Sequence, residues 1–253
     1  MRFLLLLFLF ATLAYCNRIH VSPSGQSSIS RAMLSARAGD TIVLADGKYH
    51  EEVRINSGVV LYSPNIFGAQ IIGNGRNPVV TLSSNSKISG VVISGGQNGI
   101  VSKNSGASIE NCWIHSNRGS GILAIGRLPG ITNSIISNNL NSGIQATQIG
   151  STEGELRHLT IADNRQNGID IDGDQNILLI DCLFFRNGNR AIKTPNTDLI
   201  SVSNTLIFPE QREFANHPDL AARPFFTGKH YKLRDNSTGR NKATNGQDIG
   251  FNK

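Results

Sequence analysis

One pattern recurs along the middle of the chain. It is plainest where IENCWIHSNRGSGI (109–122) is written above LIDCLFFRNGNRAI (179–192). Two further copies, ITNSIISNNLNSGI (131–144) and LRHLTIADNRQNGI (156–169), lie between them in the same frame, and ISGGQNGI (93–100) keeps the second half. The closing isoleucines of the five copies are 22, 22, 25 and 23 residues apart: Ile100, Ile122, Ile144, Ile169 and Ile192. A repeat of this length predicts a solenoid, in which each unit packs on the next.

Each copy holds three short pieces of alternating apolar character, separated by Asn, Gly and Ser, and none has the apolar spacing of a helix. Three strands per unit predict an all-β fold, a single right-handed parallel β-helix over residues 17–253. We expect its coils over 41–208. The competing solenoid is a leucine-rich repeat, but that repeat needs Leu at several set positions where this chain has Ile, Val and Gly.

Both ends of the predicted stack have their own signals. SSISRAMLSARAGD (27–40) places four apolar residues at i, i+3, i+4 and i+7: Ile29, Ala32, Met33 and Ala36. This predicts a short capping helix over 27–38, which covers the open end of the solenoid. The repeat is lost after Pro209, and 209–253 is expected to be a closing tail. We expect the tail to pack, because six of its side chains are large and apolar: Phe225, Phe226, Tyr231, Leu233, Ile249 and Phe251.

Two positions of the repeat carry mostly asparagine. One holds Asn117, Asn139, Asn164 and Asn187, and the other holds Asn111, Asn133, His158 and Asp181. Asparagine tolerates left-handed backbone geometry and stacks its amides between identical neighbours. We therefore expect both sets to shape turns and to take no part in chemistry.

The cysteines test this alignment. Cys112 and Cys182 share one position but lie three coils apart, which is about 14 Å at the spacing of paired strands. A disulfide needs Cα atoms within about 7 Å. We therefore expect both cysteines to be buried thiols that form no disulfide.

The chain opens with MRFLLLLFLFATLAYCN, which has the composition of a signal peptide over residues 1–16. The apolar run is shorter than the roughly 20 residues that a membrane span needs. We expect a secreted protein, extracellular or periplasmic, with no membrane span. Lipid attachment at Cys16 is disfavoured, because the bulky Tyr15 precedes it.

Net charge narrows the choice of partner. Removing residues 1–16 takes away Arg2 and no acid, so the net charge of +6 falls by one to +5. In an exported chain with few aromatic residues, a basic balance favours an acidic polysaccharide over nucleic acid. We expect the protein to be a monomer.

The first coil carries a resemblance. The predicted helix is followed by AGDTIVLADGKYHEEVRI (38–55) and then by Gly-rich coils. This order resembles the pectate-lyase-like superfamily of right-handed parallel β-helix proteins. The first coil is similar to that of chondroitinase-B and alginate-lyase relatives, and DIGFN (248–252) resembles the closing motif of secreted β-helix proteins. The resemblance implies this fold over most of 19–253. It says less about the reaction, because one fold carries many activities.

The segment NGIDIDGDQN (167–176) supplies the candidate site. Side chains alternate along a strand, so Ile169 and Ile171 point inwards while Asp170 and Asp172 point outwards. The same outward position in successive coils is occupied by Val101, Leu123, Gln145, Asp170 and Lys193, and the next outward position by Lys103, Ile125, Thr147, Asp172 and Pro195. Stacking places Asp170 about 5 Å from Lys193. In the superfamily, the substrate groove runs over the corresponding sheet.

This cluster suits cleavage of a uronic-acid polymer by β-elimination, in which a base removes the C5 proton once the adjacent carboxylate is neutralised. We expect Lys193 to be the base, and Arg190 or Arg165 to bind the carboxylate or assist the leaving oxygen. Asp170, Gln145 and Leu123 are expected to contact substrate. Calcium is the expected cofactor, held by Asp170, Asp172 and Asp174. Related lyases set Lys and Arg on neighbouring coils, whereas Lys193 and Arg190 belong to one coil.

Other functions use the same residues. An inverting glycoside hydrolase needs two carboxylates about 6.5–9.5 Å apart, which Asp170 and Asp172 would just meet. A uronan epimerase would share the proton abstraction but needs a second group on the opposite face. A non-catalytic glycan-binding or surface β-helix needs no chemistry, and an exposed Asp and Lys on adjacent strands also form ordinary pairs worth about 0.2–1 kcal/mol.

Overall fold

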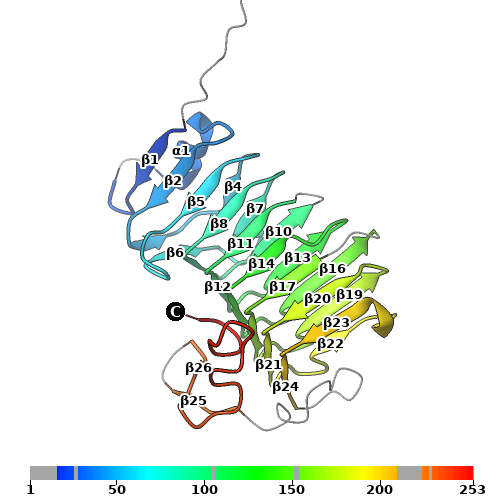
Figure 1. The fold of residues 1–253 in the computed structure, drawn as a ribbon. Helices are drawn as coiled ribbons and strands as arrows, with labels where there is room; N and C mark the ends of the chain where they lie inside the picture. The colour runs from blue at the N-terminus through cyan, green and yellow to red at the C-terminus, as the bar shows by residue number, and fades with distance from the viewer. Residues whose placement is uncertain are drawn as a thin grey trace, which may run out of the picture.

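The computed structural model describes residues 16–25, 28–103, 106–150, 154–209, 224–227 and 230–252. Most of the predicted signal peptide and residues 210–223 of the predicted tail lie outside these ranges. In the described part the chain winds into a stack of coils, each with one short strand in each of three parallel sheets (Figure 1). This confirms the β-helix and rules out the leucine-rich repeat.

Between residues 41 and 208 the strands follow the order first sheet, second sheet, third sheet along the chain, and strands of the same sheet pair from one coil to the next. The nine strands of the first sheet are β1 (Arg18–Val21), β2 (Thr41–Leu44), β5 (Val60–Tyr62), β8 (Lys87–Ser89), β11 (Ser108–Glu110), β14 (Gly130–Thr132), β17 (Gly154–Arg157), β20 (Ile177–Ile180) and β23 (Ile200–Ser203). The eight strands of the second sheet are β3 (Gly47–Tyr49), β6 (Ala69–Ile72), β9 (Val91–Ser94), β12 (Trp113–His115), β15 (Ile135–Ser137), β18 (Thr160–Ala162), β21 (Leu183–Phe185) and β24 (Leu206–Phe208). The seven strands of the third sheet are β4 (Val53–Ile55), β7 (Val80–Leu82), β10 (Ile100–Lys103), β13 (Ile122–Ile125), β16 (Ile144–Ile149), β19 (Ile169–Gly173) and β22 (Ile192–Lys193).

The register follows the sequence repeat. The five aligned isoleucines pair in series along the third sheet, Ile100 with Ile122 and so on to Ile192. Each is at most 1% exposed. The predicted stack of buried isoleucines is therefore confirmed, and it forms one wall of the core.

Four of these five isoleucines follow a glycine, and the glycine has a steric cause; Ala191 precedes the fifth, Ile192. A Cβ placed on Gly121 would lie 2.7 Å from the carbonyl oxygen of Gly143 and 2.6 Å from Cγ2 of Ile136. Gly143 is crowded in the same way by the carbonyl oxygen of Gly168, at 2.7 Å. At these positions the next coil approaches so closely that a side chain does not fit.

Both asparagine positions shape turns, as predicted. Asn117, Asn139, Asn164 and Asn187 form a ladder with amide-to-amide hydrogen bonds of 2.9, 2.9 and 3.0 Å. The residue directly before each of these asparagines has a left-handed backbone, for example Ser116 (φ 53°) and Asn138 (φ 56°). At the other position the occupants themselves are left-handed: Asn111, Asn133, His158 and Asp181.

The N-terminal end is capped as expected, by a shorter helix than predicted. Helix α1 (Ile29–Ser35) begins at Ser28, whose side chain accepts a hydrogen bond from the Arg31 amide at 3.1 Å. The predicted apolar face, Ile29, Ala32, Met33 and Ala36, is buried. Among the described residues, no helix has the length and apolar character needed to cross a bilayer.

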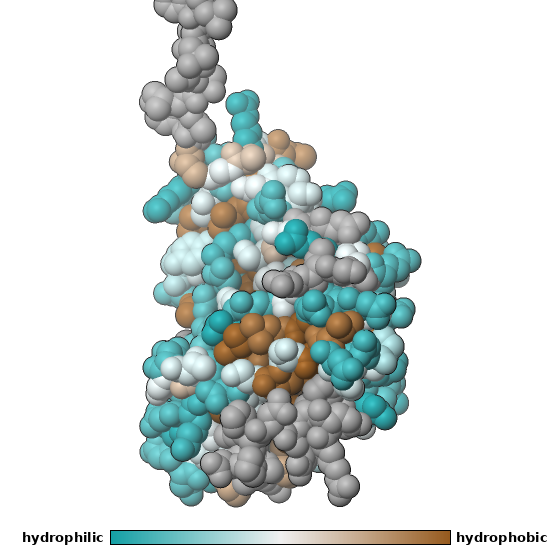
Figure 2. Space-filling model, turned by 45° about the vertical axis from the view of Figure 1, so that its right-hand side comes forward, coloured by the Kyte–Doolittle hydropathy of each residue, from teal (hydrophilic) through white to brown (hydrophobic). Residues whose placement is uncertain are grey.

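Hydrophobic surface remains near the far end. Figure 2 shows a mainly hydrophilic face interrupted by a hydrophobic patch in the lower half of the view, at the level of the last coils in Figure 1. In the last coil Ala191 and Val202 are only partly buried against the core, as is Ile19 at the opposite end. Coils at the ends of a stack have a neighbour on one side only, which leaves such residues less covered.

Cys112 and Cys182 are buried and form no disulfide, as expected. Burial raises the pKa of both thiols to about 12. At neutral pH both are protonated thiols, which makes them unreactive.

The closing tail lies across the second sheet (Figure 1). It contains a short antiparallel pair, β25 (Phe226–Thr227) and β26 (Lys232–Leu233). The Tyr231 hydroxyl donates to Asp163 Oδ2 at 2.6 Å, and Asn252 exchanges two 2.8 Å hydrogen bonds with the Asn133 side chain. Five of the six predicted apolar side chains pack, but Phe225 is 49% exposed.

Candidate functional site

A depression of about 370 Å³ lies on the outer face of the third sheet, over its last three strands, β16, β19 and β22. Its lining residues are Gln145, Ala146, Thr147, Asp170, Ile171, Asp172, Lys193, Thr194 and Pro195. Four of the predicted site residues therefore meet in one place: Lys193, Asp170, Asp172 and Gln145.

The strand register brings these four together. Gln145 pairs with Asp170, and Asp170 pairs with Lys193, as the alignment predicts. The second outward column does not keep the predicted pairing. Ala146 pairs with Ile171, but the next pair along the two strands is Ile149 with Gly173. β16 thus has one extra residue there, with Gln148 left-handed at φ 54°. This bulge ends the predicted one-to-one match of Thr147 with Asp172, although both still line the depression.

Asp170 is the best-anchored polar residue of the depression. Its Oδ1 lies 3.1 Å from the Lys193 ammonium, and its Oδ2 accepts a 3.0 Å hydrogen bond from the Asn167 amide. The Asp170 side chain is 21% exposed and that of Lys193 is 59% exposed. Asp170 is therefore held in place from two sides, while the lysine end of the pair remains accessible to a ligand.

Gln145 occupies the coil before Asp170. Its Oε1 accepts hydrogen bonds from Ser120 Oγ at 2.9 Å and from Asn141 Nδ2 at 3.3 Å. Within the described ranges its NH₂ group has no partner, so it can donate to a ligand hydroxyl. Leu123, one coil earlier, is half-buried and does not line the depression, and Val101, predicted to point to solvent, is only 6% exposed.

The two predicted arginines lie in the turns that lead into β19 and β22. The Arg165 amide donates to the carbonyl oxygen of Asn139 at 2.9 Å, and the Arg190 amide donates to Asn167 Oδ1 at 3.3 Å. Both side chains are exposed, and neither lines the depression. Their roles toward a substrate carboxylate remain predictions.

The three aspartates do not form a metal cluster. Across the described residues there is no group of three or more His, Cys, Asp or Glu placed to hold an ion. Strand β19 ends at Gly173, so the alternation of side chains that would place Asp174 on the same face as Asp172 stops before Asp174. Asp174 does not line the depression. Asp170 is moreover paired with a cation already. These residues do not fit a calcium site of three aspartates, and binding by Asp170 and Asp172 alone remains a prediction.

The sequence-based interpretation missed two residues. Asn167 bonds to both the Asp170 carboxylate and the Arg190 backbone, and Thr194 lines the depression beside Lys193. A signal for Asn167 was available, since QNGI at 97–100 recurs at 166–169. The Oδ1 of Asn98, its counterpart, accepts from the Ser120 amide at 2.9 Å.

Comparison with known proteins agrees with the fold. Residues 77–208 match the model of a family described as a right-handed β-helix region. The chain belongs to this right-handed β-helix family. No curated protein matches the chain.

Two solved β-helix structures are similar to it. One is a mannuronic acid specific polysaccharide family 6 lyase from human gut microbiota, with a TM-score of 0.57 and 14% identity over 76% of this chain. The chain covers only 54% of that enzyme. The other is an alginate lyase from Paenibacillus sp. str. FPU-7, with a TM-score of 0.54 and 17% identity over 76% of this chain and 75% of that one. At such identities the likeness establishes the fold and confirms the resemblance at that level.

Proposed function

We propose that this β-helix protein is a polysaccharide lyase that cleaves an acidic, uronic-acid polymer by β-elimination at the depression on the third sheet. The observation that carries the proposal is the pairing of Lys193 with Asp170 at 3.1 Å, in a depression also lined by Asp172 and Gln145. Two structural neighbours that are lyases on the same fold support it.

The reaction makes three demands on the protein. A base takes the proton from C5, the C–H electrons form the C4–C5 double bond, and the C4–O bond breaks as the leaving oxygen gains a proton. A positive group must also neutralise the substrate carboxylate, because the C5 proton is otherwise too weakly acidic. Base, cation and proton donor must therefore meet around one sugar.

The site residues match these demands as follows. A substrate carboxylate competes with Asp170 for the exposed Lys193 ammonium, which draws the polymer into the depression. With the carboxylate bound by Arg190 or Arg165, Lys193 in its neutral form takes the C5 proton. Water entering the open depression protonates the leaving oxygen, assisted by the other arginine. The free NH₂ of Gln145 donates to a sugar hydroxyl and orients the ring. The hydrogen bond from Asn167 holds the Asp170 carboxylate in a fixed position beside Lys193.

The site favours a glycoside hydrolase and an epimerase less than a lyase. A glycoside hydrolase would use Asp170 and Asp172, which both line the depression, but it has no use for a lysine bonded to one of them. An epimerase needs a second proton donor facing the first, and no His or Tyr is among the lining residues. A non-catalytic glycan binder fits the shallow shape equally well, and a direct assay must separate it from the lyase.

That assay is a screen of the purified protein against pectate, alginate and glycosaminoglycans. The unsaturated product of β-elimination absorbs ultraviolet light, so a rise in absorbance identifies the substrate. A polymer that binds without producing unsaturated ends would assign the chain to the glycan-binding class instead. Neutral polymers are the matched control and should give no signal. Export from the cytoplasm, expected from residues 1–16, belongs to the same proposal.

A further inference from the structure

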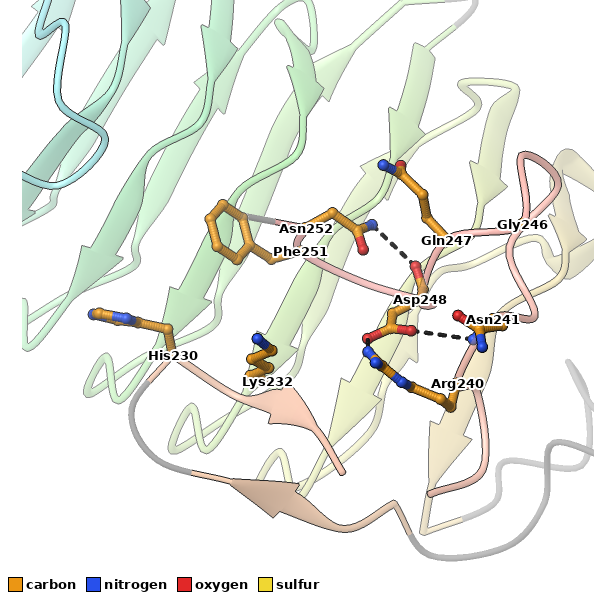
Figure 3. Close-up of a pocket in the computed structure, with 9 residues that line it drawn as sticks. All are labelled: His230, Lys232, Arg240, Asn241, Gly246, Gln247, Asp248, Phe251 and Asn252. Atoms are coloured by element: carbon orange, nitrogen blue, oxygen red, sulfur yellow. Dashed lines mark hydrogen bonds and ion pairs between the residues drawn. The ribbon is translucent and has the colours of Figure 1, made fainter. Parts of the chain in front are cut away.

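A second cavity, of about 400 Å³, lies within the closing tail on the side of the second sheet (Figure 3). Every lining residue comes from 230–252: His230, Lys232, Arg240, Asn241, Gly246, Gln247, Asp248, Phe251 and Asn252. The depression described above is on the third sheet, so the two sites lie on different faces of the stack. The size is within the range of small-molecule sites.

The coil stack holds the walls of this cavity in place. The Phe251 ring stacks on Phe67 at a centroid distance of 5.2 Å, and its amide donates to Thr160 Oγ1 at 3.0 Å. Asn252 next to it is bonded twice to Asn133. Preset walls lower the ordering cost of binding a ligand.

The cavity carries one cation without a counter-charge. Within the cavity Arg240 is neutralised by Asp248 at 2.6 Å; Asp235, 3.2 Å from the same guanidinium, is 99% exposed and does not line the cavity. Lys232 is exposed, and its ammonium has no hydrogen bond or ion pair with the residues that the structure describes. The cavity therefore favours a ligand with a negative charge at the Lys232 end.

The rest of the lining suits a sugar. The face of an aromatic ring is weakly negative and attracts the C–H groups of a pyranose, and Phe251 supplies such a ring. The side-chain amide of Asn241 and the NH₂ group of Gln247 have no partner within the described ranges, so both can bond to hydroxyls. An aromatic ring, two free amides and one free cation match a sugar that bears a carboxylate.

We infer that this cavity is a second binding site, for one acidic sugar unit of a polyuronate, in which Lys232 binds the carboxylate. The inference rests on the proposed function, because the polymer cleaved on the third sheet is the source of that sugar. Binding at both sites raises the overall affinity for a long chain by effective concentration.

Trp113 provides a built-in reporter for this cavity. It is the only tryptophan of the chain. Its ring meets the ring of His230, a lining residue, edge-on at a centroid distance of 4.6 Å. Trp113 is on β12 of the second sheet, so its fluorescence responds to the cavity and not to the depression.

The test is a titration of the full-length protein with a short oligomannuronate, followed by Trp113 emission. We expect a saturable change, and a neutral oligosaccharide of equal length should cause none. Lys232→Ala should raise Kd about threefold to tenfold, the range for loss of one exposed charged contact. Lys48→Ala, which removes an exposed lysine from β3 of the same sheet, should leave Kd unchanged.

Two results would overturn the inference: equal Kd values for Lys232→Ala and the unchanged protein, or an equal response to the neutral oligosaccharide. The absorbance assay keeps this separate from the proposed function. Emission change without cleavage supports the second site and rejects the lyase, whereas cleavage without emission change rejects the second site alone.

Discussion

The Lys193 ammonium lies 3.1 Å from Oδ1 of Asp170, the residue directly opposite on the preceding coil. The pair arises because strands of neighbouring coils stack without offset, which turns a separation of 23 residues in sequence into adjacent positions in a sheet. Asn167 holds the other oxygen of the same carboxylate, so the pair has a defined geometry on an otherwise shallow surface.

Lys193→Ala should abolish formation of the unsaturated product, a loss of at least about 100-fold, which is typical when a catalytic base is removed. Binding of the polymer, measured by calorimetry, should weaken far less. Lys103→Ala is the matched control, since it removes an exposed lysine from β10 of the same sheet. Full lyase activity in Lys193→Ala would reject Lys193 as the base.

Calcium binding can be tested by thermal unfolding. If Asp170 and Asp172 bind the ion, calcium at about 100 times its Kd should stabilise the protein by about 2.7 kcal/mol, visible as a higher Tm. The double variant Asp170→Asn/Asp172→Asn should lose this response, while Asp174→Asn should retain it. Superimposable melting curves with calcium and with a chelator would leave the aspartates without a metal.

The packing of the tail depends on Gly250. Its φ is +94°, and a Cβ there would lie 2.6 Å from Thr160 Oγ1, which cannot retreat without losing its bond to the Phe251 amide. Gly246 also has a positive φ, +77°, but nothing lies within 4 Å of its Cβ position. Gly246→Ala should cost about 1 kcal/mol of unfolding free energy, the penalty of left-handed backbone. Gly250→Ala should cost about 1–3 kcal/mol more from the clash. Equal losses in denaturant titrations would show that the contact with Thr160 does not matter.

His115 should make stability depend on pH. Burial, reinforced by the nearby His230, lowers the pKa of His115 below its ordinary value. The unfolded chain therefore binds a proton more readily than the folded protein, and stability is lost as pH falls below about 6.5, the pKa of an unperturbed histidine. His115→Gln should flatten the fall in denaturation midpoint between about pH 7 and 5. An unchanged slope in the variant would assign the pH dependence to other groups.

The sequence by itself determined the coil register and the inward face of the third sheet. Ile144 is buried opposite Ile122 and Ile169, and Asp170 faces outwards next to Lys193, because unstaggered stacking converts equal frame positions into spatial neighbours. The same logic placed Cys112 and Cys182 three coils apart. Within the repeat, the position of a residue in its copy therefore predicts which residues of the neighbouring coils it contacts.

Only the tertiary structure decided what falls outside the repeat. The bulge after Ala146 and the end of β19 at Gly173 separate Asp174 from the depression. Alternation of apolar and polar residues predicts neither the bulge nor the strand end. The path of the tail, which brings Asn252 to Asn133 and Tyr231 to Asp163, joins residues 119 and 68 positions apart. No periodicity relates such residues, so the cavity lined by the tail exists only once the chain has folded back on its own sheet.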